Sequence, residues 1–362
     1  MPSVHAVIMA GGSGTRFWPA SRQDRPKQLL PLLDDKPMLQ AAVERVADVC
    51  PADNVWIVTN PKQKKAIGKL LLDFPVDRIL VEPEARDTAP CIAFAMAAIA
   101  ARDPDATLVV LPADQVVAPV SEFTRMAARA RELAADRKTL VTFGVPPRFP
   151  ATGYGYIELG EPRDDARPRA FAVRSFREKP DAATARRLVD DGGFWWNSGI
   201  LVFHLDAMQV AMAAHAPDLA AATDRMRRAI AEGRRGQVTR AFKRAPKTSI
   251  DYAIMEKAEH LAVVECTAHW DDVGSFPALA RVLAGDAHGN HLSLHDGAAA
   301  TLLESHGNIV YAEGRRTVAL FGVEGLVVAA VGDAVLVCPK EQAADLKRLV
   351  ERLRAEQHTD LL

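Results

Sequence analysis

The sequence contains little cysteine and no long apolar run. Its four cysteines lie far apart and form no CxxC pair, so we expect reduced, mostly buried thiols rather than disulfides. No stretch reaches the ~18 to 20 apolar residues of a membrane span, and the N-terminus lacks the basic segment of a signal peptide. The net charge of -1 argues against a polyanion-binding surface. We therefore expect a cytoplasmic protein that binds neither membrane nor nucleic acid.

Two common phosphate-binding motifs are also missing. No Gly-Lys-Ser/Thr sequence occurs, which excludes a P-loop. Gly12 and Gly14 are followed by Phe17, where a dinucleotide fingerprint needs its third glycine. The residues that follow are unsuited to a helix because of three prolines, Pro19, Pro26 and Pro31. This segment is therefore expected to stay extended for roughly 20 residues or more and to wrap a ligand.

Strand-like and helix-like patterns alternate over the first part of the chain. Strands are expected at 5–10, 55–60, 78–84, 107–114 and 139–145, and helices at 38–49, 62–72, 89–102 and 122–135. Continuous Val/Ile/Leu strands separated by helices are typical of a parallel sheet covered on both faces. The fold class expected is therefore α/β, with a Rossmann-like mixed, mainly parallel sheet flanked by helices.

The pattern changes twice further along the chain. After residue 149 the strands are less regular, which indicates a β-rich extension of the same sheet with a second ligand site. From about residue 290, short β-type runs alternate with glycine, and an amphipathic helix is expected at 341–356. We expect a catalytic domain at 1–286 and a small β-rich domain at 287–362.

The first strand leads into a glycine-rich segment with two cations. Gly11, Gly12 and Gly14 are followed by Arg16 and, later, Lys27. Glycine lets backbone N–H groups approach an anion closely, and the cations add charge, so the segment fits a phosphate cradle. A tight turn with solvated cations is the structural alternative, which this segment alone does not exclude.

Residues 11–32, "GGSGTRFWPASRQDRPKQLLPL", resemble the signature of the sugar-nucleotide pyrophosphorylases. The Trp-Pro-x-Ser and Pro-Lys-Gln versions within it resemble the mannose-1-phosphate guanylyltransferases in particular. Further matches follow in the family's order: "EPEARDTAP", "LPAD", "GYGYI", "FREKP", "WNSGI", "SIDYAIMEK" and "DDVGSF". They cover most of the expected catalytic domain, far more than a chance motif match would.

The resemblance implies a fold, a reaction and a cofactor. The fold is that of the nucleotide-diphospho-sugar transferases, with a β-helix-like C-terminal unit that mediates dimer contacts, so we expect a homodimer. The reaction is attack of mannose 1-phosphate on the α-phosphorus of GTP, with Mg²⁺, to give GDP-mannose and pyrophosphate. Two alternatives stay open: a related enzyme that uses another base or sugar, such as glucose 1-phosphate, and a non-catalytic relative that binds GDP-sugar.

Five charged residues are expected to carry the catalysis, because the reaction gathers negative charge. They are Arg16, Lys27, Asp114, Lys179 and Asp272. Arg16 and Lys27 would clamp the triphosphate, and Asp114 and Asp272 would hold the Mg²⁺. Asp271 is the competing neighbour, and a pair of aspartates alone is more often a solvated turn.

The resemblance also assigns two binding subsites. The nucleotide subsite is expected to contain Ala10, Gly11, Gly12, Gly14, Thr15, Arg16, Lys27, Glu82, Arg86, Thr88, Ala89, Pro112 and Asp114. The sugar phosphate subsite is expected to contain Gly153, Tyr154, Glu178, Lys179, Asn197 and Ser198. In the second subsite Lys179 would neutralise the attacking phosphate and Glu178 would accept hydrogen bonds from sugar hydroxyls. Backbone groups of Thr88 and Ala89 are candidates for contact with the purine.

For three other features we favour a structural role over a role in ligand binding. His288, His291 and His295 match no common zinc spacing, so a hinge or loop is preferred to a metal site. The basic run at 225–244 is expected to be a solvated helix. Trp195 and Trp196 are expected to pack rather than to stack on sugar, whereas Trp18 fits packing and base stacking equally well.

Overall fold

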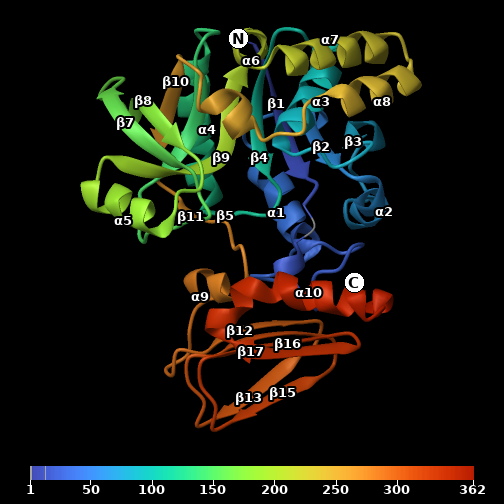
Figure 1. Cartoon of the computed structure of the whole chain (residues 1–362), viewed down its shortest axis with the longest axis vertical. Helices are drawn as coiled ribbons and strands as arrows, with labels where there is room; N and C mark the ends of the chain where they lie inside the picture. The colour runs from blue at the N-terminus through green and yellow to red at the C-terminus, as the bar shows by residue number, and fades with distance from the viewer. Residues whose placement is uncertain (1, 13) are drawn as a thin grey trace.

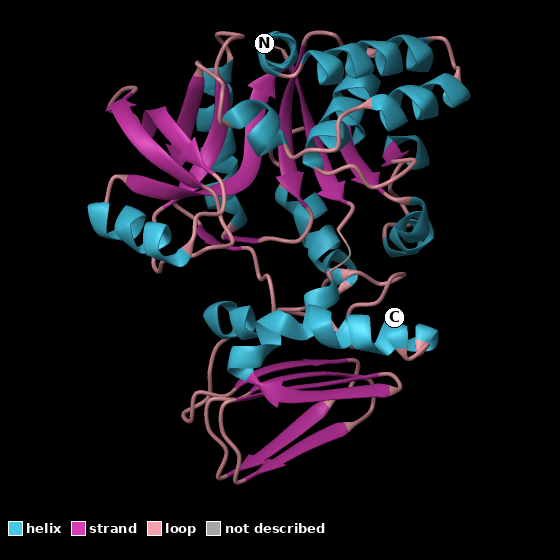
Figure 2. Cartoon of the chain, in the orientation of Figure 1, coloured by secondary structure: helices cyan, strands magenta, loops and turns pink. Residues whose placement is uncertain are grey.

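The computed structural model describes residues 2–12 and 14–362. A large α/β unit is followed by a smaller unit built of strands, and the C-terminal helix α10 (Leu346–Ala355) lies between the two (Figure 1). The smaller unit consists almost entirely of strands and loops (Figure 2). The two-unit organisation thus has the α/β and β-rich character expected from the sequence.

A nine-stranded mixed sheet forms the centre of the large unit, in the order β3-β2-β1-β4-β9-β6-β10-β8-β7. Its strands are β1 (Ser3–Ala10), β2 (Val55–Thr59), β3 (Ile79–Val81), β4 (Ala106–Pro112), β6 (Leu140–Val145), β7 (Tyr156–Pro162), β8 (Ala170–Arg177), β9 (Phe194–His204) and β10 (Leu261–Glu265). Strands β3, β2, β1 and β4 are parallel, and so are β6 and β10. The remaining pairings, each of which involves β7, β8 or β9, are antiparallel. The mixed α/β sheet is confirmed, but it is not mainly parallel: four of its nine strand pairings are parallel and five are antiparallel, with most of the parallel ones at the N-terminal strands.

Helices cover both faces of this sheet. They are α1 (Met38–Arg45), α2 (Pro61–Leu70), α3 (Thr88–Ala100), α4 (Val120–Ala134), α5 (Ala182–Asp191), α6 (Leu205–His215), α7 (Pro217–Ala231) and α8 (Arg235–Arg244). Alternate residues of β1 enter two separate apolar clusters, because successive strand side chains point to opposite faces. Ile8 packs with α1 and α4, and Val7 packs with α3, α6 and α7. The continuous apolar run of β1 is thus buried on both sides.

The second half of the sheet closes on itself. Strand β7 pairs with β8 on one side and with the first residues of β9 on the other. A small separate core of Ile157, Trp195 and Val263 fills this curved part. Trp195 and Trp196 are both buried, which confirms that they pack. A two-stranded pair, β5 (Val116–Ala118) with β11 (His269–Asp271), and the short helix α9 (Leu279–Val282) lead toward the C-terminal unit.

The C-terminal unit is a stack of coils. Its strands are β12 (His291–His295), β13 (Ala299–Leu303), β14 (Ile309–Glu313), β15 (Thr317–Phe321), β16 (Leu326–Val331) and β17 (Ala334–Pro339). Strands β12, β14 and β16 pair in parallel, as do β13 and β15. Each coil advances by 18 residues, and at one corner the amide of Asn308 donates to the side-chain oxygen of Asn290 at 3.0 Å. The same corner needs Gly307, whose φ of 62° is in the left-handed region.

Three segments differ from expectation. The helix expected at 38–49 ends at Arg45. The basic run forms two helices, α7 and α8, because Gly233 breaks it with a φ of 69°. His291 and His295 lie in strand β12 rather than in a loop. Within the described residues, no helix combines the length and the apolar character needed to cross a membrane.

Candidate functional site

The glycine-rich segment after β1 forms a closed loop and not an extended strand. Two 3-10 turns, Thr15–Phe17 and Lys27–Leu29, bend the chain back on itself. Gly14 has a φ of 59°, and a Cβ placed on it would lie 2.6 Å from the Cβ of Lys27. The hydroxyl of Ser21 also donates to the Gly14 carbonyl at 2.6 Å. The expectation of an extended segment is therefore wrong, because these contacts bring its two ends together.

The start of this loop leaves backbone donors available. Gly11 and Gly12 are exposed, and a Cβ on Gly12 would meet no atom within 4 Å. The carbonyl of Gly12 accepts bonds from the side-chain amides of Gln28 and Gln63, at 3.2 and 3.0 Å. No described residue accepts a hydrogen bond from the N–H of Gly11 or Gly12. An anion above the loop could therefore take these donors. Ser13, between Gly12 and Gly14, lies outside the described residues.

Lys27 joins two acidic segments that are far apart in the sequence. Its side chain is nearly buried, and Nζ donates to the Asp114 carbonyl at 2.6 Å and lies 3.0 Å from Asp114 Oδ2. The same Nζ donates to the backbone carbonyl of Asp272. Asp114 follows Pro112 at the carboxyl end of β4, the edge at which open α/β sheets bind ligands. The two aspartates named from the sequence thus meet at one lysine.

Arg16 belongs to the same group of side chains. A Cβ placed on Gly274 would lie 2.8 Å from Asp272 Oδ2 and 3.3 Å from Arg16 Nη1. Both side chains therefore border the same glycine, which must remain small to admit them. Arg16, Lys27, Asp114 and Asp272 form one cluster beside the glycine loop.

Asp271 and Asp272 have different surroundings. Asp271 is buried and accepts two bonds from Arg281, at 2.6 and 2.8 Å, and one from the backbone N–H of Val273 at 2.8 Å. Asp272 keeps a partly exposed carboxylate, and its Oδ1 accepts a hydrogen bond from the Tyr154 hydroxyl. Burial and the charge of Asp272 raise the pKa of Tyr154. Both oxygens of Asp271 are thus used in internal bonds, whereas Asp272 Oδ2 accepts no hydrogen bond from the described residues and lies beside Gly274 and Arg16.

Glu82 lies under the glycine loop, directly after β3. Only 6% of it is exposed, and its Oε2 would lie 3.2 Å from a Cβ on Gly11. Its Oε1 has no hydrogen-bond partner among the described residues. Burial raises the pKa of this carboxyl to about 7, against a smaller opposing effect of the bond with Cys91. A buried carboxylate with an unpartnered oxygen needs a donor, and a ligand can supply one.

The rest of the expected base-binding segment is bonded to the chain after α8. Arg86 Nη1 donates to the Ala245 carbonyl at 2.8 Å, and the Thr88 hydroxyl accepts the N–H of Ile250 at 2.9 Å. Ala89 is buried and its N–H donates to the Thr248 carbonyl at 3.2 Å. These bonds fix the shape of the segment and use the Ala89 N–H proposed for the purine.

The sugar-side residues form a second group. Lys179 Nζ donates to Glu178 Oε1 at 2.6 Å, and the other oxygen of Glu178 would lie 2.6 Å from a Cβ on Gly155. A Cβ on Gly153 would meet no atom within 4 Å, so space is open beside it. Lys179 has a φ of 44°, a conformation that is uncommon for a residue with a side chain. The contact with Glu178 is thus made from an unusual backbone conformation.

Asp251 is a member of this group that the sequence analysis did not single out, although it lies in the quoted "SIDYAIMEK". Asn197 Nδ2 donates to Asp251 Oδ1 at 3.1 Å, and the Thr142 hydroxyl donates to the Asn197 oxygen at 2.8 Å. Burial and the nearby charge of Glu178 raise the pKa of Asp251 to about 6. Ser198 is only 2% exposed, and its hydroxyl accepts the N–H of Ile200. Asp251 is therefore the residue close enough to Glu178 to be affected by its charge, and Asn197 joins this group through Asp251, whereas the Ser198 hydroxyl bonds its own backbone.

The structure also shows the surroundings of Trp18 and of the histidines considered as metal ligands. Trp18 is buried and its indole N–H donates to the Leu361 carbonyl at 2.8 Å, so it packs. His291 Nδ1 lies 3.0 Å from the Leu283 carbonyl, and His295 Nε2 lies 2.8 Å from the Ser293 hydroxyl. Within the described part of the chain, no three His, Cys, Asp or Glu side chains are grouped as metal ligands.

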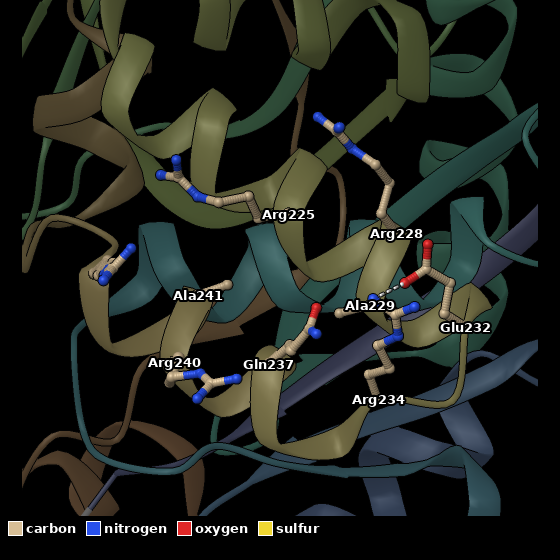
Figure 3. Close-up of a pocket in the computed structure, with 9 residues that line it drawn as sticks. Arg225, Arg228, Ala229, Glu232, Arg234, Gln237, Arg240 and Ala241 are labelled. Atoms are coloured by element: carbon tan, nitrogen blue, oxygen red, sulfur yellow. Dashed lines mark ion pairs between the residues drawn. The ribbon is translucent and has the colours of Figure 1, made fainter.

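The basic run lines a surface hollow of about 390 Å³ between α7 and α8, with Ala229 and Ala241 among its lining residues (Figure 3). Its charged residues are Arg225, Arg228, Glu232, Arg234, Arg240 and Arg244. All of them are exposed, as expected for solvated helices, and Arg234 pairs with Glu232 at 3.1 Å.

Comparison with known proteins is consistent along the chain. Residues 5–288 match the family model described as nucleotidyl transferase, and residues 299–353 match the one described as MannoseP isomerase/GMP-like beta-helix domain. A crystal structure from Thermus thermophilus, described as a mannose-1-phosphate geranyltransferase, superposes with a TM-score of 0.87 at 36% identity, covering 97% of this chain and 99% of that one.

Curated bacterial relatives are similar over nearly the whole chain. The Xanthan biosynthesis protein XanB of Xanthomonas campestris pv. campestris (strain B100) is 37% identical, over 98% of this chain and 74% of its own length. The mannose-1-phosphate guanylyltransferase of Escherichia coli (strain K12) is 36% identical over the same shares.

The different surroundings of the two neighbouring aspartates predict different effects of removing each charge. Asp271→Asn should lower the free energy of unfolding by about 2 kcal/mol or more, because it breaks the paired bonds with Arg281. Asp272→Asn should lower it by less, about 1 kcal/mol or below, because that carboxylate is partly exposed and the amide oxygen of asparagine can still accept the bond from Tyr154. Urea unfolding of both variants measures this. Equal destabilisation by the two substitutions would contradict the structural distinction.

Proposed function

The chain belongs to the nucleotidyl transferase family, and within it we propose that this protein is a mannose-1-phosphate guanylyltransferase. It would convert GTP and α-D-mannose 1-phosphate to GDP-mannose and pyrophosphate. One observation carries the proposal: Lys27 joins Asp114 and Asp272 beside the exposed glycine loop, next to Arg16. The names of the curated relatives support the choice of mannose 1-phosphate and of a guanylyl group, and the name of the Thermus structure supports mannose 1-phosphate.

The cluster suits in-line transfer between phosphates. A phosphate oxygen of the sugar phosphate attacks the α-phosphorus of GTP, the bond from that phosphorus to the β-phosphate bridging oxygen breaks, and pyrophosphate leaves. Little proton transfer is needed, so catalysis depends on position and on neutralising charge. Arg16 would neutralise the leaving phosphates, and Lys27 would hold the triphosphate against the loop.

The acidic pair fits one Mg²⁺. Mg²⁺ in proteins is commonly held by one or two carboxylates, with water and phosphate oxygens as its other ligands. Lys27 bonds the carboxylate of Asp114 and the backbone carbonyl of Asp272, so these two aspartates would be the carboxylates that hold the ion, and no group of three metal-binding side chains occurs in the part of the chain that the structure describes. When bound, the ion would neutralise charge on the phosphates.

The second group of residues would hold the sugar phosphate. Lys179 would balance the attacking phosphate, and Glu178, Asn197 and Asp251 offer acceptors and a donor to sugar hydroxyls. Their mutual contacts, 2.6 Å for Lys179 with Glu178 and 3.1 Å for Asn197 with Asp251, prearrange them.

A substrate panel tests the proposed reaction. Wild-type protein should turn over GTP with mannose 1-phosphate faster than any other pairing of four nucleoside triphosphates with mannose or glucose 1-phosphate. Arg16→Ala should lower kcat about 100-fold, because it removes charge stabilisation from the transition state. Pyrophosphate release measures both. A preference for UTP or dTTP would replace the proposal by a sister enzyme, and GDP-mannose binding without turnover would indicate a regulatory relative.

Glu82 is the residue that we assign to the guanine. Guanine presents two adjacent donors, N1–H and the 2-amino group, and a carboxylate can accept from both. Glu82 has an oxygen without a partner among the described residues, is nearly buried and lies against Gly11 of the loop. Sites built to bond a specific polar group reject ligands that lack it, because their own groups are then left unpaired.

Glu82→Gln tests this assignment. It should raise KM for GTP about tenfold or more, while KM for ITP, which lacks the 2-amino group, should rise less. In the wild type, kcat/KM for GTP should fall as pH drops below about 7, because protonation of Glu82 removes an acceptor. Glu84→Gln, a neighbour paired with Arg86, is the matched control. Equal effects on GTP and ITP, or an unchanged pH profile in Glu82→Gln, would rule out this role.

The protein would act as a homodimer through an exposed apolar surface of the C-terminal unit. Leu303, Phe321, Val335 and Val337 are each between 58% and 69% exposed and lie on β13, β15 and β17. A cluster of large apolar side chains that is open to water marks an interaction surface. A second copy of the chain is the partner that the family resemblance implies.

Sedimentation of a charged variant tests the dimer. Phe321→Asp with Val337→Asp should shift the wild-type dimer to a monomer, because two buried charges would face the partner. Val76→Asp is the control, since Val76 is 68% exposed but lies on the large unit. A monomeric wild type, or a double variant that remains dimeric, would contradict this interface.

A further inference from the structure

The loop between Gly14 and Lys27 packs against the C-terminal unit. Phe17 and Trp18 are buried in an apolar cluster whose other members come largely from that unit, among them Ile309, Tyr311, Val327, Leu336, Leu346 and Val350. The ring of Phe17 lies 4.9 Å from that of Phe276, which in turn lies 5.9 Å from Tyr311. The catalytic loop and the β-helix therefore share one core.

Polar contacts attach the same loop at several points. The Trp18 indole bonds the Leu361 carbonyl, and Arg22 bonds the Asp360 carbonyl at 3.0 Å and pairs with Asp333. Farther along, the Ser293 hydroxyl donates to the Leu32 carbonyl at 3.0 Å. Each contact joins the segment after β1 to a residue near the other end of the chain.

The innermost of these contacts is an ion pair. Arg25 Nη1 donates to Glu313 Oε2 at 2.6 Å, and the Tyr311 hydroxyl donates to the other oxygen of Glu313. Glu313 is only 7% exposed. Burial alone would lower the pKa of Arg25, but the bond and charge of Glu313 raise it. Desolvating a buried carboxylate costs free energy, so this ion pair adds little stability compared with an apolar side chain. What the ion pair does provide is a fixed position for the Arg25 guanidinium.

Arg25 is connected to Lys27 by a short, constrained segment. Arg22 and Arg25 exchange backbone bonds at 3.0 and 3.1 Å, which closes a tight turn. Pro26, whose ring restricts its φ, then leads directly into the 3-10 turn that begins at Lys27. A change in the position of Arg25 is therefore transmitted to Lys27, which joins Asp114 and Asp272.

We propose that the C-terminal β-helix is a working part of the catalytic site, and that Glu313 is a positioning residue that acts through Arg25 on Lys27. The β12–β14–β16 sheet, with Ser293, Tyr311 and Glu313, serves as the surface on which the triphosphate loop is shaped. The catalytic consequence rests on the proposed function, in which Lys27 holds the triphosphate.

Glu313→Gln is the main test. This substitution removes the charge that holds Arg25 but keeps the size of the side chain. Arg25 should therefore no longer be held in one position, while Phe17 and Trp18 stay packed against the C-terminal unit. We expect kcat/KM for GTP to fall about tenfold or more, because small displacements of positioned groups have large effects on rate. KM for mannose 1-phosphate should stay within twofold, since Lys179 and Asn197 are held by other contacts. Glu313→Asp should recover part of the loss.

Asp333→Asn is the matched control. Asp333 also pairs with an arginine of this loop, but it is exposed, so its removal should change kcat/KM for GTP by less than twofold. Two outcomes would overturn the proposal. One is unchanged kinetics per folded molecule in Glu313→Gln, even with a lower melting temperature. The other is an equal rise in KM for both substrates.

Hydrogen exchange separates this proposal from the proposed function. Glu313→Gln should speed amide exchange within 15–32 at least fivefold while β1 and β4 keep their protection, and this is independent of the substrate used. If the wild type were inactive but Glu313→Gln showed this exchange pattern, the assigned reaction would be contradicted, whereas the coupling of Glu313 to residues 15–32 would still be supported. Unchanged exchange in 15–32 would contradict the coupling itself.

Discussion

The site depends on the three bonds made by one nearly buried ammonium group. Lys27 Nζ reaches the carbonyl and carboxylate of Asp114 and the carbonyl of Asp272, and so joins the end of β4 to the segment after β11. Without that group, the Asp114 carboxylate would lose its ion pair, and the bond that joins its segment to the backbone of Asp272 would be missing. The same lysine lies against Gly14. The shape of the glycine loop and the position of the two aspartate segments therefore depend on one another.

That constraint explains why the loop has so little ordinary secondary structure. Helix formation directly after β1 would carry Lys27 away from Gly14, and the prolines of the segment prevent it. The shape of the loop is instead stabilised by contacts with another part of the chain, because Phe17 and Trp18 are buried against the C-terminal coils. A long irregular segment is stable here because a second unit supplies the core that the segment lacks.

Much of this arrangement could be predicted from the sequence, and the parts that could not have a common physical reason. The strands of the parallel half and the pairing of Asp114 with Asp272 were within reach, because apolar runs and family-like motifs are local signals. The closure of the loop was not, because it depends on contacts such as Trp18 with Leu361, which no local pattern encodes. Asp251 could not be singled out, because nothing in the sequence around a single aspartate indicates that its side chain will be buried next to Asn197. The β-helix did carry a readable signal, since Gly289, Gly307 and Gly325 repeat at the length of one coil.

Tyr154 connects the two groups of site residues. Its hydroxyl donates to Asp272, and its ring contacts Trp196 edge-on at 5.2 Å, directly before Asn197 in β9. The acidic pair and the sugar-side group are therefore not independent surfaces, because one rigid aromatic side chain touches the first and packs beside the second. In the proposed reaction two phosphates must meet in line, so the separation of the two groups that would hold them matters as much as the contacts within either group. Tyr154 lies two residues before β7 and Trp196 lies in β9, and these two strands pair antiparallel, so the antiparallel half of the sheet carries the connection between the two groups.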